Sequence, residues 1–192
     1  MSAPFLLHLL RHGAPELTGR MLGRTDSPVT AEGLAGCLSR VKSLDFNTLV
    51  CSDLMRSQAI ADAIGRERGL APTIDSRWRE LDFGDWDGLA AAEIDAAALQ
   101  RFWDDPDGAP PPGGERWSDL IARITDAIED LTPETSLIVT HGGAIRAALK
   151  ARCRFGQREL WAFDLPYAAL ITLRIWPDRT AQIVGLQTDP VS

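Results

Sequence analysis

The chain has 192 residues, 45% of them hydrophobic, and a formal charge of -7 at pH 7. This length and composition are typical of one soluble globular domain spanning residues 1–192. The acidic balance, with the basic residues scattered along the chain, argues against nucleic acid as a partner.

A buried strand is the first expected element. Residues 5–10 are nearly all apolar and lead into Arg11-His12-Gly13, which indicates a strand that ends in a loop. The apolar run is too short to span a bilayer and has neither a basic region before it nor a small-residue cleavage site. The sequence therefore predicts a cytoplasmic protein with no membrane partner.

Strands and helices then alternate. A Gly- and Pro-rich loop at 14–28 precedes a helix that Thr30 can cap. Residues 48–51 predict a second strand, and residues 54–68 a second helix closed by Gly69. Such alternation predicts an α/β protein with a parallel sheet. The later expected elements are a helix at 118–131, a strand at 136–140, a helix from Ala144 to about Arg152, and a hairpin of strands at 169–176 and 180–186.

An inserted flap is expected at about 86–117. Its first part, residues 89–103, has the pattern of a helix. Residues 104–114 (DDPDGAPPPGG) are too rich in proline for regular structure. The cysteines Cys37, Cys51 and Cys153 lack CxxC spacing and are expected to be reduced core thiols.

Two histidines follow directly after predicted strands. His12 follows the first strand, and His141 follows the strand at 136–140, immediately before two glycines and a helix. The carboxyl ends of parallel strands form the ligand edge of an open α/β sheet. With Arg11 and the backbone N–H groups at the helix start near Gly142, these imidazoles would form a phosphate pocket.

Phosphoryl transfer fits this set of side chains. A neutral imidazole can attack phosphorus when its other ring nitrogen donates to a backbone acceptor. Forked arginine donors and a second histidine can neutralise the equatorial oxygens, and Arg11, Arg56 and His141 could fill these roles. The chain has no HExxH, no paired cysteines and no histidines four residues apart on a helix, so a metal site is the minor alternative. His8 is interpreted as a packing histidine.

A proton donor for the leaving oxygen is expected in the stretch after Arg79. Glu80 is a candidate general acid, which could later activate water. Asp82, Asp85 and Asp87 compete with it, because the residue types alone do not separate a catalytic carboxylate from solvated loop charges.

Four motifs together resemble the histidine phosphatase superfamily, which has the phosphoglycerate-mutase-like fold. They are Leu9-Leu10-Arg11-His12-Gly13, the stretch from Ser52 to Ala59 (SDLMRSQA), the stretch from Arg79 to Gly84 (RELDFG) and Thr140-His141-Gly142-Gly143. The resemblance covers nearly the whole chain. It implies a three-layer α/β/α fold with a mostly parallel central sheet.

The resemblance also implies roles for individual residues. His12 would be the phosphorylated nucleophile, Arg11, Arg56 and His141 would hold the phosphoryl group, and Glu80 would be the proton donor, with no metal or cofactor. The sequence departs from the family pattern after Gly13, where Ala14-Pro15 and Thr18 replace Glu-Thr and a later Asn. Thr18 could still offer a hydroxyl to phosphate.

Within the superfamily, the sequence looks like α-ribazole phosphatases. The similar stretches are LDFGDWDG at 81–88, Phe102-Trp103, PGGE at 112–115 and LPYAA at 165–169. Trp86, Trp103 and Trp117 could stack on a flat benzimidazole, although tryptophans with this spacing are more often core residues.

Other functions remain open at this point. A broad-specificity sugar or small-molecule phosphatase and a protein phosphohistidine phosphatase share the chemistry. Phosphoglycerate mutase is less favoured because the flap is acidic. A phosphate-ester binding module without turnover is the non-enzymatic alternative, and the sequence leaves an oligomer open.

Overall fold

The computed structural model describes residues 3–188. Within that range the strands form one mixed sheet in the order β3-β2-β4-β1-β5-β6. Strands β1 to β4 pair with one another in parallel, whereas β5 pairs antiparallel to both β1 and β6. The strands are β1 (Phe5–Arg11), β2 (Thr48–Cys51), β3 (Thr73–Ile74), β4 (Ser136–Thr140), β5 (Leu170–Ile175) and β6 (Ala181–Gln187).

The register of β1 and β4 places the two strand-end histidines side by side. Arg11 is the partner of Thr140 in this parallel pair. The backbone N–H of His12 donates to the Thr140 carbonyl at 2.8 Å and so extends the pairing by one residue. His12 and His141 therefore leave adjacent strands at the same level. His8, on the same strand, is buried and its Nδ1 lies 2.9 Å from the Thr172 hydroxyl, as expected of a packing histidine.

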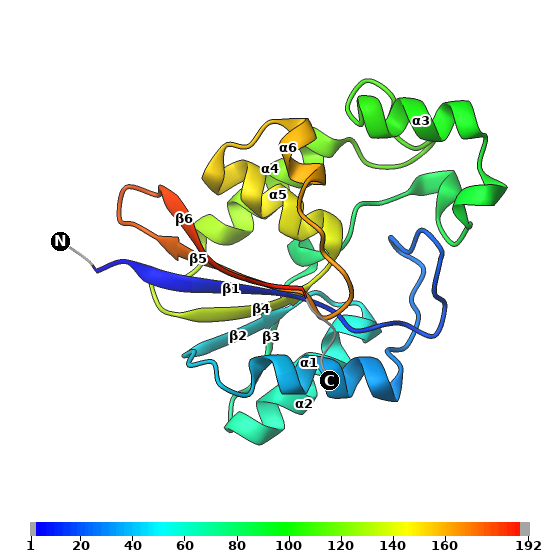
Figure 1. Cartoon of the computed structure of the whole chain (residues 1–192). Coiled ribbons are helices and arrows are strands. Elements are labelled where there is room, and N and C mark those ends of the chain that lie inside the picture. The colour runs from blue at the N-terminus through cyan, green and yellow to red at the C-terminus, as the bar shows by residue number, and fades with distance from the viewer. Residues whose placement is uncertain (1–2, 189–192) are drawn as a thin grey trace.

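Helices cover both faces of the sheet, which confirms the three-layer α/β/α architecture (Figure 1). Helices α1 and α2 pack on one face, and α4 and α5 pack on the other. Thr30 caps α1 as expected, because its side chain accepts from the Gly33 N–H at 3.0 Å. The α-helices are α1 (Ala31–Val41), α2 (Met55–Arg68), α3 (Ala96–Asp104), α4 (Trp117–Glu129), α5 (Gly142–Cys153) and α6 (Gln157–Trp161).

The flap differs from the expected single helix at 89–103. It contains a short 3-10 helix, Ala91–Glu93, followed by a break and then α3. The break arises at Asp95, whose side chain accepts from the Ala98 N–H at 2.8 Å and starts a new helix there. Figure 1 shows α3 projecting beyond the end of the sheet at which β1 and β4 finish.

Three further features complete the described fold. The short elements β3 and α6 were not predicted from the sequence. Cys37 and Cys51 are buried free thiols, and burial raises the pKa of each to about 12. Over residues 3–188, none of the helices combines the length and apolar character needed to cross a membrane.

Candidate active site

His12 is held in the tautomer that a nucleophile requires. Its ring is buried, with 5% of the residue exposed. The Nδ1 atom lies 2.7 Å from the Gly13 carbonyl oxygen, which can only accept, so Nδ1 carries the proton. The lone pair is therefore on Nε2, and this nitrogen can attack phosphorus.

His141 faces His12 across the pocket. The ring centroids are 5.0 Å apart, and His141 is fully buried at the start of α5. Its Nε2 lies 2.7 Å from the Ser52 hydroxyl, while its Nδ1 is buried with no hydrogen-bond partner. Ser52 was not singled out as a site residue from the sequence, although it opens the motif that contains Arg56.

Two arginines bring buried positive charge to the same place. Arg56 is fully buried, and its guanidinium donates to loop carbonyls that include Leu22 at 2.7 Å and Thr25 at 3.0 Å. Arg11 donates to the Leu165 carbonyl, and its guanidinium lies 4.4 Å from the centre of the Tyr167 ring. The Nε atoms of both arginines are buried without partners. Buried donors without partners are rare in native proteins, so these atoms indicate a site for an anion.

Both site histidines are neutral in the free protein. Burial is the largest cause that lowers the pKa of His12 well below 6.5, and the charges of Arg56 and Arg11 lower it further. The pKa of His141 is lowered in the same way, first by burial and then by neighbouring cations. A phosphate dianion bound between these groups would favour protonation of His141, which would add a donor to the anion.

The histidine pKa values can be tested directly. The chain has 3 histidines, and the pKa of each is lowered in the folded protein. Because burial disfavours the charged imidazolium, we expect each ring to bind its proton only below pH 6.5. NMR titration of the imidazole nitrogens would measure this, with the urea-unfolded chain as a control whose midpoints return to about 6.5. A midpoint at or above 6.5 for His12 or His141 would contradict the neutral pocket.

Glu80 lies at the N-terminus of α5. Its carboxylate accepts from the Leu81 N–H at 2.8 Å and from the Gly143 N–H at 3.0 Å. A Cβ on Gly143 would lie 2.0 Å from Glu80 Oε1, so a side chain at this position would displace the Glu80 carboxylate. Glu80 lines the cavity around His12 together with Arg11.

The competing carboxylates lie elsewhere. Asp82 forms an ion pair with Arg24 at 2.7 Å, and Asp85 is exposed. Asp87 is occupied by hydrogen bonds from the loop at 23–25. Among the carboxylates described between residues 80 and 87, only Glu80 lines the His12 cavity.

The cavity around His12 is bounded by the loop after β1 and by the flap. It has a volume of about 210 Å³ and includes Arg20, Phe83 and Tyr167 in its wall. Thr18 is exposed on this loop and does not line the cavity, so the structure does not bring it to the other predicted site residues. Gly142 begins α5 and lines a neighbouring cavity that also includes Arg11 and Glu80.

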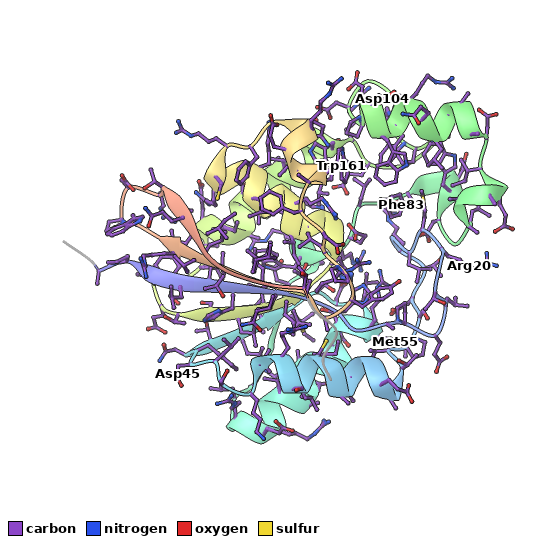
Figure 2. The ribbon with its side chains drawn as sticks, viewed as in Figure 1. Arg20, Asp45, Met55, Phe83, Asp104 and Trp161 are labelled. Atoms are coloured by element: carbon purple, nitrogen blue, oxygen red, sulfur yellow. The ribbon has the colours of Figure 1, made fainter. Side chains whose placement is uncertain are left out.

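The neighbouring cavity, about 120 Å³ in volume, is largely aromatic. Phe83 and Trp103 belong to both cavities. Figure 2 shows Phe83 between Trp161, which ends α6, and Arg20 on the loop after β1. Trp117 lines the aromatic cavity as well, whereas Trp86 does not: it is buried and packs edge-on against Phe102, in line with the favoured interpretation of a core tryptophan. The wall contributed by Trp161 was missed because α6 is too short to give a periodic pattern.

No group of three or more His, Cys, Asp or Glu residues that could hold a metal ion occurs in the part of the chain that the structure describes. The arrangement around His12 is that of a cavity with a buried imidazole, the cation Arg11 and one carboxylate, Glu80, in its wall.

Comparison with known proteins identifies the family to which the chain belongs. The family model of the histidine phosphatase superfamily (branch 1) matches residues 7–188. Glucosyl-3-phosphoglycerate phosphatase of Mycobacterium tuberculosis (strain H37Rv) is 33% identical over 164 residues, which are 76% of this chain and 73% of that protein. The 2,3-bisphosphoglycerate-dependent phosphoglycerate mutase of Azorhizobium caulinodans is 28% identical over 194 residues, which are 91% and 94% of the two chains.

A solved structure also matches over most of the chain. The α-ribazole phosphatase from Shigella flexneri superposes with a TM-score of 0.83 at 23% identity, covering 96% of each chain. At that identity the likeness concerns the fold. The match of the family model over residues 7–188, with the phosphatases among the relatives, shows that this chain belongs to the histidine phosphatase superfamily and is a phosphoric monoester hydrolase.

Proposed function

We propose that the protein hydrolyses phosphomonoesters without a metal, through a phosphohistidine formed on His12. The observation that carries this proposal is the 2.7 Å contact from His12 Nδ1 to the Gly13 carbonyl oxygen, which leaves the Nε2 lone pair free in a cavity lined by Arg11, with the buried charge of Arg56 close enough to lower the His12 pKa. Arg11, Arg56 and His141 hold the three equatorial oxygens, the two arginines as permanent cations and His141 once the bound phosphate favours its protonation.

The reaction has two steps. His12 Nε2 attacks phosphorus and the P–O bond to the leaving group breaks, while protonated Glu80 gives its proton to the leaving oxygen. Water then attacks the phosphohistidine, Glu80 takes a proton from that water, and the P–N bond breaks to release phosphate. Glu80 loses a proton in the first step and gains one in the second, so each step leaves it in the form that the other step requires.

The proposed substrate is α-ribazole 5′-phosphate. The aromatic cavity supports this choice, because it adjoins the His12 cavity and presents Phe83, Trp103 and Trp161 to the organic part of an ester. Flat apolar rings bind well in such pockets. The sequence stretches similar to α-ribazole phosphatases support it independently.

A second candidate substrate is glucosyl-3-phosphoglycerate. It is favoured by the relatives of that name, such as the protein 33% identical over 76% of this chain. The phosphoglycerate mutase relative keeps 3-phosphoglycerate as a third branch to be tested. All three substrates share the phosphoryl pocket and differ in the part that would lie against the flap.

A substrate comparison separates these branches. We expect kcat/KM for α-ribazole 5′-phosphate to exceed that for glucosyl-3-phosphoglycerate and 3-phosphoglycerate by about 100-fold, or roughly 2.7 kcal/mol of transition-state stabilisation. Ribose 5-phosphate is the matched control, since it keeps the sugar phosphate and lacks the ring. Phosphate release is the measurement. Equal rates for the riboside and for ribose 5-phosphate would exclude the α-ribazole assignment while leaving the phosphatase chemistry intact.

A further inference from the structure

Asp87 has four hydrogen bonds to one short loop. Its Oδ1 accepts from the Gly23 N–H at 2.7 Å and from the Arg24 N–H at 3.2 Å. Its Oδ2 accepts from the Thr25 N–H and from the Thr25 hydroxyl, both at 2.6 Å. Asp87 follows the 3-10 helix Gly84–Trp86 at the start of the flap, so these bonds tie the flap to the loop after β1.

The opposite side of the same loop faces Arg56. The guanidinium donates to the carbonyl oxygens of Leu22 at 2.7 Å, Gly23 at 3.2 Å and Thr25 at 3.0 Å. The N–H groups of the loop thus point to a carboxylate, and its carbonyl groups point to a cation. The peptide units Leu22–Gly23 and Gly23–Arg24 are stabilised at both ends, which favours this one conformation of the loop.

Arg56 depends on this loop for its position. The side chain is fully buried, and the nearest carboxylate among its described ion pairs is Asp26 at 3.8 Å. The loop carbonyls occupy donors on Nη1 and Nη2, whereas Nε is buried without a partner. The carbonyl positions therefore determine how the guanidinium is presented to an anion. A planar guanidinium recognises oxyanions through fixed donor directions, so a tilt of the group weakens the contact.

We propose that Asp87 is a positioning residue for phosphoryl transfer: through the backbone of residues 22–25 it fixes the Arg56 guanidinium on the phosphoryl group. The inference rests on the proposed function, because it takes Arg56 as a ligand of the phosphoryl oxygens. In this proposal Asp87, the third aspartate of the stretch LDFGDWDG, acts in positioning Arg56 and not in proton transfer.

The test compares Asp87→Asn with Asp85→Asn, in the parent protein and in an Arg56→Ala background. Asparagine keeps the size of the side chain, but its amide nitrogen cannot accept a hydrogen bond from the loop. We expect Asp87→Asn to lower kcat/KM about tenfold or more and to raise the inhibition constant of inorganic phosphate in parallel, as expected for a misplaced contact. Asp85→Asn, an exposed carboxylate two residues away, should retain kcat/KM within about twofold.

The Arg56→Ala background separates positioning from a general loss of structure. If Asp87 acts through Arg56, Asp87→Asn should cost less than about threefold in kcat/KM once Arg56 is absent, because coupled residues are not additive. Any change in thermal stability should persist in that background. Should Asp87→Asn fail to fold, Thr25→Val removes one of the four hydrogen bonds and should give a smaller change in the same direction.

Two results would overturn the proposal. The first is that Asp87→Asn lowers kcat/KM in the Arg56→Ala background as much as it does in the parent protein. The second is that the inhibition constant of phosphate is the same in Asp87→Asn as in the parent protein. Loss of turnover in His12→Ala is measured in parallel, so that failure of the phosphohistidine mechanism is distinguishable from failure of the Asp87 inference.

Discussion

His12→Ala should lower kcat by about four orders of magnitude or more, because nothing else in the pocket offers a free imidazole lone pair to phosphorus at this position. The Gly13 carbonyl oxygen lies 2.7 Å from His12 Nδ1 and fixes the ring, so the effect arises from loss of the nucleophile itself. Steady-state phosphate release measures the loss, and added chelator should leave the parent rate unchanged.

Trapping of the phosphoenzyme strengthens this experiment. Rapid mixing with a labelled substrate and quenching in alkali should place one labelled phosphoryl group on the peptide that contains His12. A peptide that is not cut after Arg11 also contains His8, which is buried on strand β1 with its Nδ1 2.9 Å from the Thr172 hydroxyl of β5. His8→Asn is therefore the matched control and should keep the label. Label that survives in His12→Ala, or full turnover by that variant, would contradict the phosphohistidine mechanism.

Glu80→Gln should have the second largest effect, and its size should depend on the leaving group. With an alkyl phosphate we expect kcat/KM, which reports the phosphorylation step and not hydrolysis of the phosphohistidine, to fall by about 100- to 1,000-fold, because the departing alkoxide needs a proton. With p-nitrophenyl phosphate the loss should be far smaller, because nitrophenolate leaves without one. The ratio of the two losses measures proton donation apart from any distortion around the Gly143 N–H.

Asp82→Asn is the control for the Glu80 experiment. Asp82 is two residues away and pairs with Arg24 at 2.7 Å, outside the His12 cavity. Its replacement should affect both substrates equally and slightly. If Glu80→Gln reduces kcat/KM for the two substrates to the same extent, Glu80 supports the start of α5 rather than supplying the proton to the leaving group, and the acid has to be sought elsewhere.

The parts of the fold with regular patterns were predictable from the sequence. Apolar runs ending at Arg11 and Thr140 indicated buried parallel strands, and the pairing of these two residues then places the histidines together. Strand β3 was not predictable, because its residues, Thr73 and Ile74, are both exposed and show no alternation. The break of the flap helix depends on one hydrogen bond that the Asp95 side chain accepts from the Ala98 N–H, and the average composition of a sequence window does not reveal such a bond.

The site was predictable where a motif stands at a strand end, and less so where it depends on tertiary contacts. His12, His141 and Arg56 follow or flank recognisable strands. Ser52 reaches His141 only because β2 and β4 are neighbours in the sheet. Trp161 and Tyr167 come from a segment with no strong period, and they reach the pocket through the packing of α6 and the loop before β5. Thr18 resembled a phosphate ligand by position alone, but the loop leaves it exposed.

The position of β1 in the sheet has a consequence for biosynthesis. Among the six described strands this one is synthesised first, yet its hydrogen-bonding neighbours on both sides, β4 and β5, begin at residues 136 and 170. Until those segments emerge, the nascent chain carries a strongly apolar strand with two unsatisfied edges, which is a state prone to self-association. Such distant pairing also slows folding. The edges of β1 can therefore be paired only after β4 and β5 have been synthesised, and from then on the strand is protected from self-association. His12 acquires its pocket only after that point.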